Sequence, residues 1–282
     1  MSFRLFCAVC LVGWSVSPAA AQQRPLVTED PETIGAGRVL LEGGFDAVHD
    51  QHYPVSGLEG NLIRIPTIGV SVGLSSIAEF QIDGGFHNRL SITNRNLAAP
   101  LASLVTATGD VTSDVEDVVI ATKIRVLGET SSRPALGLRF ATKLPNATNE
   151  SGLGLDTTDF YVSILAGKTI RSTRIVGNAG LGVLGNPLVG TVQSDAFRGG
   201  FSIAQAITKT VEIAGEVGGQ SVWFATVPPP GAEPLGEVRA AVRYTRGRMR
   251  VDGGVLFGFT ERSPAFGVMA GVTLVAQALK GP

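Results

Sequence analysis

The sequence predicts an all-β protein: a transmembrane, antiparallel, up-and-down β-barrel of about 12 strands, with short periplasmic turns and longer extracellular loops. Three observations predict this fold. Apolar and polar residues alternate along most of the chain, the alternating stretches are long, and short connections between them alternate with long ones. Alternation with a period of two is the pattern of a strand with two different faces, because successive side chains point to opposite sides.

The stretch PALGLRFATKLP, residues 134–145, shows the two faces most plainly. Leu138 and Phe140 occupy alternate positions, and Arg139 and Lys143 occupy positions between and beyond them. In a transmembrane barrel the apolar face contacts lipid and the polar face lines the lumen, while closure pairs every backbone group. We therefore expect Leu138 and Phe140 to face the membrane, and Arg139 and Lys143 to face the lumen.

The alternating stretches divide the chain into a series of long strands. We expect strands near residues 38–49, 61–73, 77–87, 115–127, 134–144, 159–170, 173–185, 197–208, 211–223, 236–246, 248–258 and 264–278. Strands of soluble sheets usually have about five or six residues, whereas a tilted strand that spans a bilayer needs about 9–11. Most of these stretches have the longer length. An exported soluble barrel or sandwich would also alternate, but it would not need long charged side chains on one face of so many strands.

The connections between the strands alternate in length. We place tight turns near residues 75–76, 128–133, 171–172, 208–210 and 246–247. We place longer connections at residues 50–60, 88–114, 145–158, 186–196 and 224–235. Outer-membrane barrels have short turns at the periplasmic end and longer loops at the extracellular end, and an even number of strands returns both ends to the periplasm.

The N-terminus predicts a secretory signal peptide. Arg4 provides the positive charge, residues 5–16 the apolar region, and Ala19–Ala21 the small residues for cleavage before Gln22. The apolar region is too short to span a bilayer. The chain is therefore expected to be exported, and the barrel pattern places it in the outer membrane of a Gram-negative bacterium.

Composition excludes several classes of function. Both cysteines, Cys7 and Cys10, belong to the signal peptide, so we expect no disulfide and no cysteine metal site in the mature chain. The formal net charge is −1, which does not favour binding to nucleic acid. Only 17% of residues are charged, less than the roughly 25% of soluble proteins. The expected partners are outer-membrane lipid and a small solute, and no cofactor or metal is expected; the oligomeric state stays open.

These observations divide the chain into four regions. We assign the signal peptide to residues 1–21, a periplasmic N-terminal segment to 22–37, the barrel to 38–279 and a tail to 280–282. The N-terminal segment is polar and contains two prolines, Pro25 and Pro31. It either hangs in the periplasm or reaches into the lumen as a partial plug.

Several segments together resemble a known family. They are RPLVTED at residues 24–30, a strand that contains Lys123, KLP at 143–145, and TTDF at 157–160. They resemble the outer-membrane family named for the meta-pathway of phenol degradation, whose members are often called simply transporters. Phe160 replaces the tyrosine of that pattern, and Glu29 replaces its first aspartate. The resemblance covers most of residues 24–170, and it implies an outer-membrane barrel that passes small hydrophobic or aromatic compounds.

Charged residues on the polar face are the candidate lumen lining. They are Glu79, Asp83, Lys123, Arg125, Arg139, Lys143, Asp159, Glu212, Glu216, Arg239, Arg243, Arg250 and Asp252. We expect three cross-strand pairs: Lys123 beside Arg139, Lys143 facing Asp159, and Glu216 facing Arg243 with Arg250 and Asp252 adjacent. Two cations side by side destabilise a sheet unless an acid intervenes. The set is consistent either with ion pairs that brace the interior or with a charged ladder that guides solutes.

Catalytic residues are the other possibility to weigh, because some outer-membrane barrels are hydrolases. The chain has three histidines, His49, His52 and His87, and Ser91 follows the last of them by four residues. No nucleophile-elbow motif accompanies them, so we expect no enzyme. The function predicted from the sequence is a porin-like channel or transporter for small solutes. The alternatives are a non-conducting structural or adhesive barrel and, further behind, an outer-membrane hydrolase.

Overall fold

The computed structural model describes residues 24–222 and 227–278. The predicted signal peptide and the predicted tail lie outside these ranges. Almost all regular structure in the described residues is β-strand, with one short 3-10 helix at Ala102–Leu104. In this part of the chain, no helix combines the length and the apolar character needed to cross a membrane.

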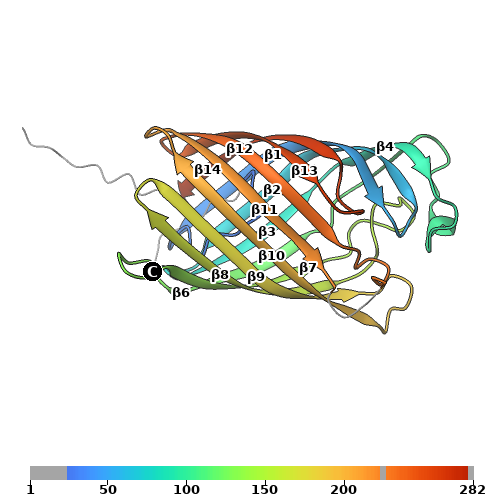
Figure 1. Ribbon diagram of the computed structural model, residues 1–282, viewed down its shortest axis with the longest axis horizontal. Coiled ribbons are helices and arrows are strands. Elements are labelled where there is room, and N and C mark those ends of the chain that lie inside the picture. Colours follow the sequence, from blue (N-terminus) through green and yellow to red (C-terminus); the bar gives the residue numbers. More distant parts are fainter. Residues whose placement is uncertain (1–23, 223–226, 279–282) are drawn as a thin grey trace, which may run out of the picture.

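The strands form one closed antiparallel barrel (Figure 1). β1 (Arg38–Tyr53) pairs with β14 (Phe266–Gln277) on one side and with β2 (Leu58–Gly73) on the other, which closes the sheet. The other strands are β3 (Ala78–Gly85), β4 (Asn88–Arg95), β5 (Val111–Asp114), β6 (Val119–Leu127), β7 (Ala135–Lys143), β8 (Asp159–Ile170), β9 (Thr173–Gly185), β10 (Gln193–Ala206), β11 (Val211–Ser221), β12 (Leu235–Arg246) and β13 (Met249–Gly258). Closure leaves no free edge and pairs the backbone within the membrane.

Two strands of the wall are interrupted, so fourteen segments build twelve wall strands. β2 pairs with β3 near its end and with β4 near its start, so β3 and β4 are two parts of one wall strand. β6 pairs with β3 and β5 with β4, which makes β5 and β6 the next interrupted strand. Pro66 in β2 lies opposite the first interruption and has no N–H for the ladder, while the Ile65 N–H donates to the His87 carbonyl at 2.9 Å.

The prediction of a twelve-strand antiparallel barrel is confirmed, and the prediction for residues 88–114 needs a correction. We expected a loop there, but the region contains β4, β5 and the 3-10 helix. The alternation continues beyond the interruption, since Asn88 and Leu90 are buried while Arg89 is exposed. The barrel wall therefore extends further on the extracellular side than the sequence pattern indicated.

The two faces of the wall differ in polarity as the alternation implied. On the outer face, Phe140 is 47% exposed and Ile164 is 60% exposed. Leu138 pairs directly with Ile164 and shares this face. On the inner face, the side chain of Lys123 is fully buried although it is a long cation. An apolar outer surface over a charged interior is the arrangement of a barrel in lipid.

The extracellular end of the lumen contains the largest apolar cluster. It consists of Val48, Leu58, Leu62, Leu90, Leu256 and Met269, with Tyr53, Ile92, Val105 and Leu153 packed against it. Leu153 belongs to the 145–158 connection, and the neighbouring Gly152 carbonyl accepts a hydrogen bond of 2.7 Å from Ser56. The long connections therefore fold back onto the extracellular end of the barrel.

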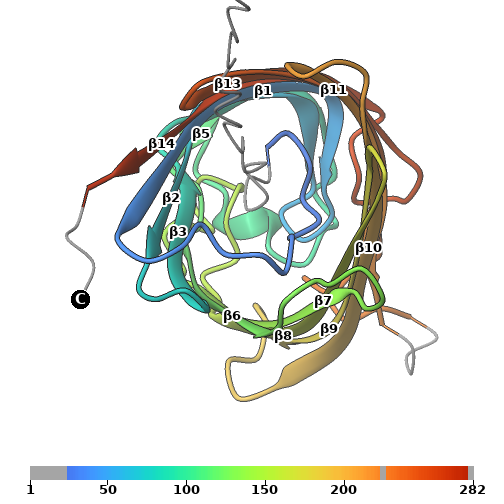
Figure 2. The same cartoon turned by 90° about the vertical axis from the view of Figure 1, so that its left-hand side faces the viewer.

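The periplasmic end of the lumen holds the N-terminal segment, which we define here as residues 24–37. In a view along the barrel, this blue trace runs inside the ring of strands before it joins β1 (Figure 2). Its backbone and side chains bond to lumen-facing residues of the wall. The sequence left two placements open for this segment, the periplasm or the lumen. Its described residues lie in the lumen.

Candidate functional site

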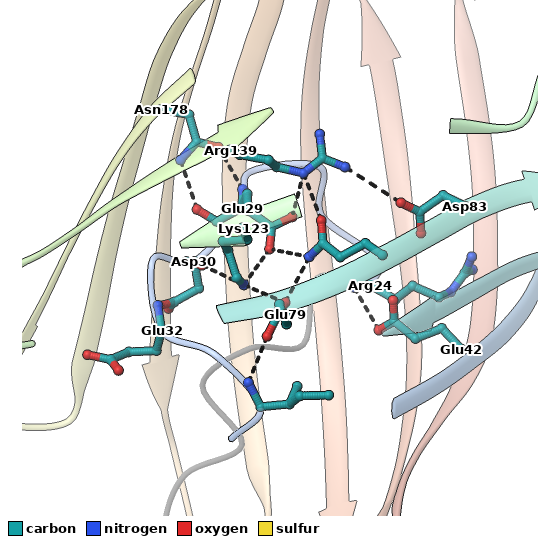
Figure 3. A network of polar contacts seen from close by, with 12 residues as sticks. Arg24, Glu29, Asp30, Glu32, Glu42, Glu79, Asp83, Lys123, Arg139 and Asn178 are labelled. Atoms are coloured by element: carbon teal, nitrogen blue, oxygen red, sulfur yellow. Dashed lines mark hydrogen bonds and ion pairs between the residues drawn. The ribbon is translucent and has the colours of Figure 1, made fainter. Parts of the chain in front are cut away.

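The contact between the N-terminal segment and the barrel wall centres on Lys123, in the middle of β6 (Figure 3). Its ammonium lies 2.7 Å from Glu29 Oε1 and 3.0 Å from Glu79 Oε1. It also donates to the Asp30 carbonyl at 2.9 Å. Three acceptors around one buried ammonium satisfy its donors, which a buried charge requires.

Arg139 lies directly across from Lys123, as the turn between β6 and β7 predicted. Its Nε donates to Gln81 Oε1 at 2.8 Å, and the guanidinium lies 3.6 Å from both Glu29 and Asp83. The two adjacent cations are therefore separated by carboxylates, which removes the repulsion expected between like charges in a sheet. This part of the lumen is braced by ion pairs and carries no unpaired positive patch.

Wall residues also bind the backbone of the N-terminal segment. The carboxylate of Glu216 accepts from the Val27 N–H at 2.9 Å and from the N–H and hydroxyl of Thr28. The amide of Asn178 accepts from the Glu29 N–H at 2.6 Å and donates to the Glu29 carbonyl at 2.8 Å. A segment without a strand partner needs such side-chain partners for its backbone groups.

Further along the segment, acidic side chains pair with arginines of the wall. Arg174 binds Asp30 through two nitrogens, at 2.8 Å and 2.6 Å, in the bidentate geometry that makes arginine–carboxylate pairs strong. Arg125 binds Glu32. The contacts of the N-terminal segment thus reach β6, β9 and β11, far apart around the barrel.

Arg24 anchors the start of the described segment. Its guanidinium donates to Thr67 at 2.7 Å and to the Ala270 carbonyl at 3.0 Å, and it lies 3.8 Å from Asp252. The wall beneath it is glycine: a Cβ at Gly44 would come within 2.3 Å of the Arg24 guanidinium, and one at Gly271 within 2.5 Å. Glycine at these positions lets the arginine lie against the strand backbone.

One of the three predicted pairs is wrong. Glu216 pairs in register with Arg239 and lies 3.9 Å from it, whereas Arg243 binds Glu212 at 2.8 Å and lies opposite Asp252. The long connection between β11 and β12 sets this register, and its length gives no local rule for it. Arg250 is buried two positions from Asp252, as expected.

The pair of Lys143 and Asp159 forms as predicted, at 3.0 Å. Lys143 also lies 3.1 Å from Asp117, and Asp159 accepts from the Gly185 N–H at 2.9 Å. Arg239 binds Glu237 at 2.7 Å. All thirteen predicted lumen residues thus lie on the inner face of the described wall, and most are tied to a neighbour.

Sequence reasoning missed the half of the site that comes from the N-terminal segment. Its residues Arg24, Glu29, Asp30 and Glu32 were assigned to a region that either hangs free or plugs the barrel. The signal in the sequence was the high density of charge in RPLVTEDPE, residues 24–32. A charged segment that does not alternate like a strand can pair with the charges of a lumen.

Two of the three histidines considered for a catalytic role have other contacts. His49 Nδ1 lies 2.6 Å from Asn61 Oδ1. The ring nitrogens of His52 lie 3.7 Å from the carboxylates of Asp50 and Glu59. This last group is the one cluster in the described residues that could hold a metal ion, and its members are all partly exposed at the tip of the β1–β2 hairpin.

Comparison with solved structures agrees with the barrel architecture. No protein-family model and no curated protein sequence matches this chain. Among solved structures, it is similar to an outer-membrane channel from Pseudomonas putida F1, with a TM-score of 0.64 at 12% identity, over 88% of this chain and 98% of that one. It is also similar to the NanC porin, with a TM-score of 0.51 at 10% identity, over 84% of this chain and 98% of the other. At these identities the likeness is one of fold, and the fold is that of an outer-membrane β-barrel.

Proposed function

We propose that this protein is an outer-membrane channel for small solutes, and that its N-terminal segment forms the constriction of the pore. The observation that supports the proposal is the charged lining of the lumen and its contacts with the N-terminal segment. Charged side chains line its inner face, and the N-terminal segment crosses it through hydrogen bonds and ion pairs. Polar side chains that line a lumen tune which solutes pass.

The solute class follows from two observations of different kinds. The family resemblance in the sequence implies small aromatic or hydrophobic compounds. The lining near the N-terminal segment is charged, which favours solutes that also carry a polar or ionised group. A barrel of twelve strands lies between the size that side chains fill and the size that leaves a wide aqueous channel, and the internal segment takes up part of the lumen, so passage is restricted to small molecules.

The test is single-channel conductance of the refolded mature protein beside a variant that lacks residues 24–34. The wall charges keep other partners in this variant, because Lys123 still faces Glu79 at 3.0 Å and Arg174 still faces Glu129 at 2.6 Å. We expect small openings for the wild type and openings several-fold larger for the deletion.

A locked variant serves as the matched control. A Cβ at Gly200 would lie 3.2 Å from Thr28 Oγ1, so cysteines at these two positions are close enough for a disulfide. The mature chain has no other cysteine. The oxidised variant should keep the small conductance. If neither the wild type nor the deletion conducts after verified insertion, the protein is a non-conducting barrel and the proposal is wrong.

A further inference from the structure

Arg198, on β10, projects into the lumen and forms no ion pair among the described residues, although Asp159 is close enough to interact with it electrostatically. It shares the inner face with the buried Ala196 and Ala204, whereas Phe201 and Ile203 lie on the exposed outer face. Its guanidinium carbon lies 4.4 Å from the centroid of the Tyr161 ring, a cation–π contact. Lys123, Arg139 and Arg174, by contrast, each contact a carboxylate.

The Tyr161 ring, which lies against the Arg198 guanidinium, is held in place by a hydrogen bond. Its hydroxyl donates to Asp159 Oδ2 at 3.0 Å. The charge of Asp159 is matched by Lys143 at 3.0 Å. A ring covers one face of Arg198 but accepts none of its N–H donors, so these donors point along the plane of the group and stay available.

Arg198 has one small and one long neighbour in the wall. Its register neighbour on β9 is Gly180, which in turn faces Ser163 on β8, and its register neighbour on β11 is Gln220. Gly200 lies two residues further toward the periplasm on the same strand. A Cβ at this position would lie 3.2 Å from Thr28 Oγ1 of the N-terminal segment. Arg198 therefore lies on the extracellular side of the proposed constriction, with Gly180 between it and Ser163.

We propose that Arg198, backed by Tyr161, binds the carboxylate of a small solute before it reaches the constriction. This inference rests on the proposed channel function. The planar fork of a guanidinium matches the two oxygens of a carboxylate, and its single charge balances a monoanion. Lys123 and Arg139 belong to the charged set that could have guided solutes, but carboxylates of the protein already occupy that pair.

The test reads the local charge without requiring ion flow. In the mature chain, which has no cysteine, Ser163→Cys places a single thiol on the strand beyond Gly180. Its modification rate is measured with a sulfonate-bearing and with a trimethylammonium-bearing methanethiosulfonate, alone and with added Arg198→Gln. Arg246→Gln, an exposed arginine at the periplasmic end of β12, is the matched control.

We expect Arg198→Gln to lower the anion-to-cation rate ratio about fivefold, as the loss of one nearby unit charge implies. Arg246→Gln should leave the ratio unchanged. Sodium acetate should slow the sulfonate reagent in the background with Arg198 and not in the Arg198→Gln background. An unchanged ratio, or a thiol that neither reagent reaches, overturns the inference. A lowered ratio in a protein that fails to conduct would support the anion site and refute only the channel.

Discussion

At the scale of single residues, the buried Lys123 is the strongest constraint in the lumen. Its side chain has no exposed surface, and two carboxylates and one carbonyl surround its ammonium. A buried ion pair adds little over a well-packed apolar pair, but removal of one partner leaves a charge without compensation. The Lys123 ammonium therefore matters for stability mainly because it compensates the charges of Glu29 and Glu79, which are buried with it.

We predict that Lys123→Met destabilises the barrel by about 3–5 kcal/mol, because Glu79 then remains buried without a cation and Glu29 keeps only Arg139, at 3.6 Å. The measurement is the free energy of unfolding of the refolded protein in a urea titration. Lys209→Met, at an exposed lysine in the β10–β11 turn, is the control and should stay within about 0.5 kcal/mol. Equal values for the two variants would show that Lys123 is not buried as an ion pair.

At the scale of elements, ion pairs hold the N-terminal segment in the barrel, and glycines of the wall leave room for its side chains against the strand backbone. Gly44 and Gly43 are neighbours in β1, yet only Gly44 faces the lumen, where Arg24 lies against it. A methyl group at Gly44 would also come within 2.5 Å of the Ala270 carbonyl, whereas one at Gly43 would meet nothing within 4 Å.

We predict that Gly44→Ala destabilises the protein by about 1–3 kcal/mol, as overpacking does, and displaces Arg24. Backbone hydrogen exchange at the neighbouring amides of Leu26 and Val27, followed by mass spectrometry, should then be faster than in the wild type. Gly43→Ala provides the control and should leave the exchange rate unchanged. The same rate in both variants would mean that Arg24 does not rest on β1.

The periplasmic turns are joined by Glu129, which lies in the connection between β6 and β7. Its carboxylate accepts from the Thr169 N–H at 2.7 Å and lies 2.6 Å from Arg174. Partial burial alone would raise the pKa of Glu129, but the Thr169 hydrogen bond, Lys168 and Arg174 outweigh it and hold the pKa below 4.5.

This lowered pKa predicts an acid-dependent loss of stability. A carboxyl whose pKa is lower in the folded state stabilises the protein above its unfolded pKa, and this contribution disappears as the pH falls through the folded pKa. The wild type should therefore be more stable than Glu129→Gln at neutral pH, and the difference should shrink below pH 4.5. Unfolding titrations across pH check this, and a difference independent of pH would contradict it.

At the scale of the whole molecule, closure of the sheet decides which face meets lipid and which meets the lumen. Leu138 shares the outer face with Ile164, and Arg139, one residue further on, reaches the N-terminal segment. We predict that Leu138→Arg costs about 2–4 kcal/mol, provided that the residue lies near the bilayer midplane. The measurement is the fraction of heat-modifiable, folded barrel in lipid vesicles against urea. Ser132→Arg in the exposed β6–β7 turn is the control, and an equal loss at both positions would reverse the assignment of the faces.

The strand pattern by itself determined the barrel, its two faces and the pairs across tight turns. These depend on local rules: side chains alternate along a strand, and a short turn sets the register of its two strands, as for Lys123 and Arg139. Only the tertiary structure decided that Glu29 neutralises Lys123, that Glu216 faces Arg239, and that Arg198 forms no ion pair within the described part of the chain. Glu29 and Lys123 are 94 positions apart, and no periodicity links an irregular segment to a wall strand. Charge complementarity in a closed space brings them together, and that space exists only once the barrel has closed.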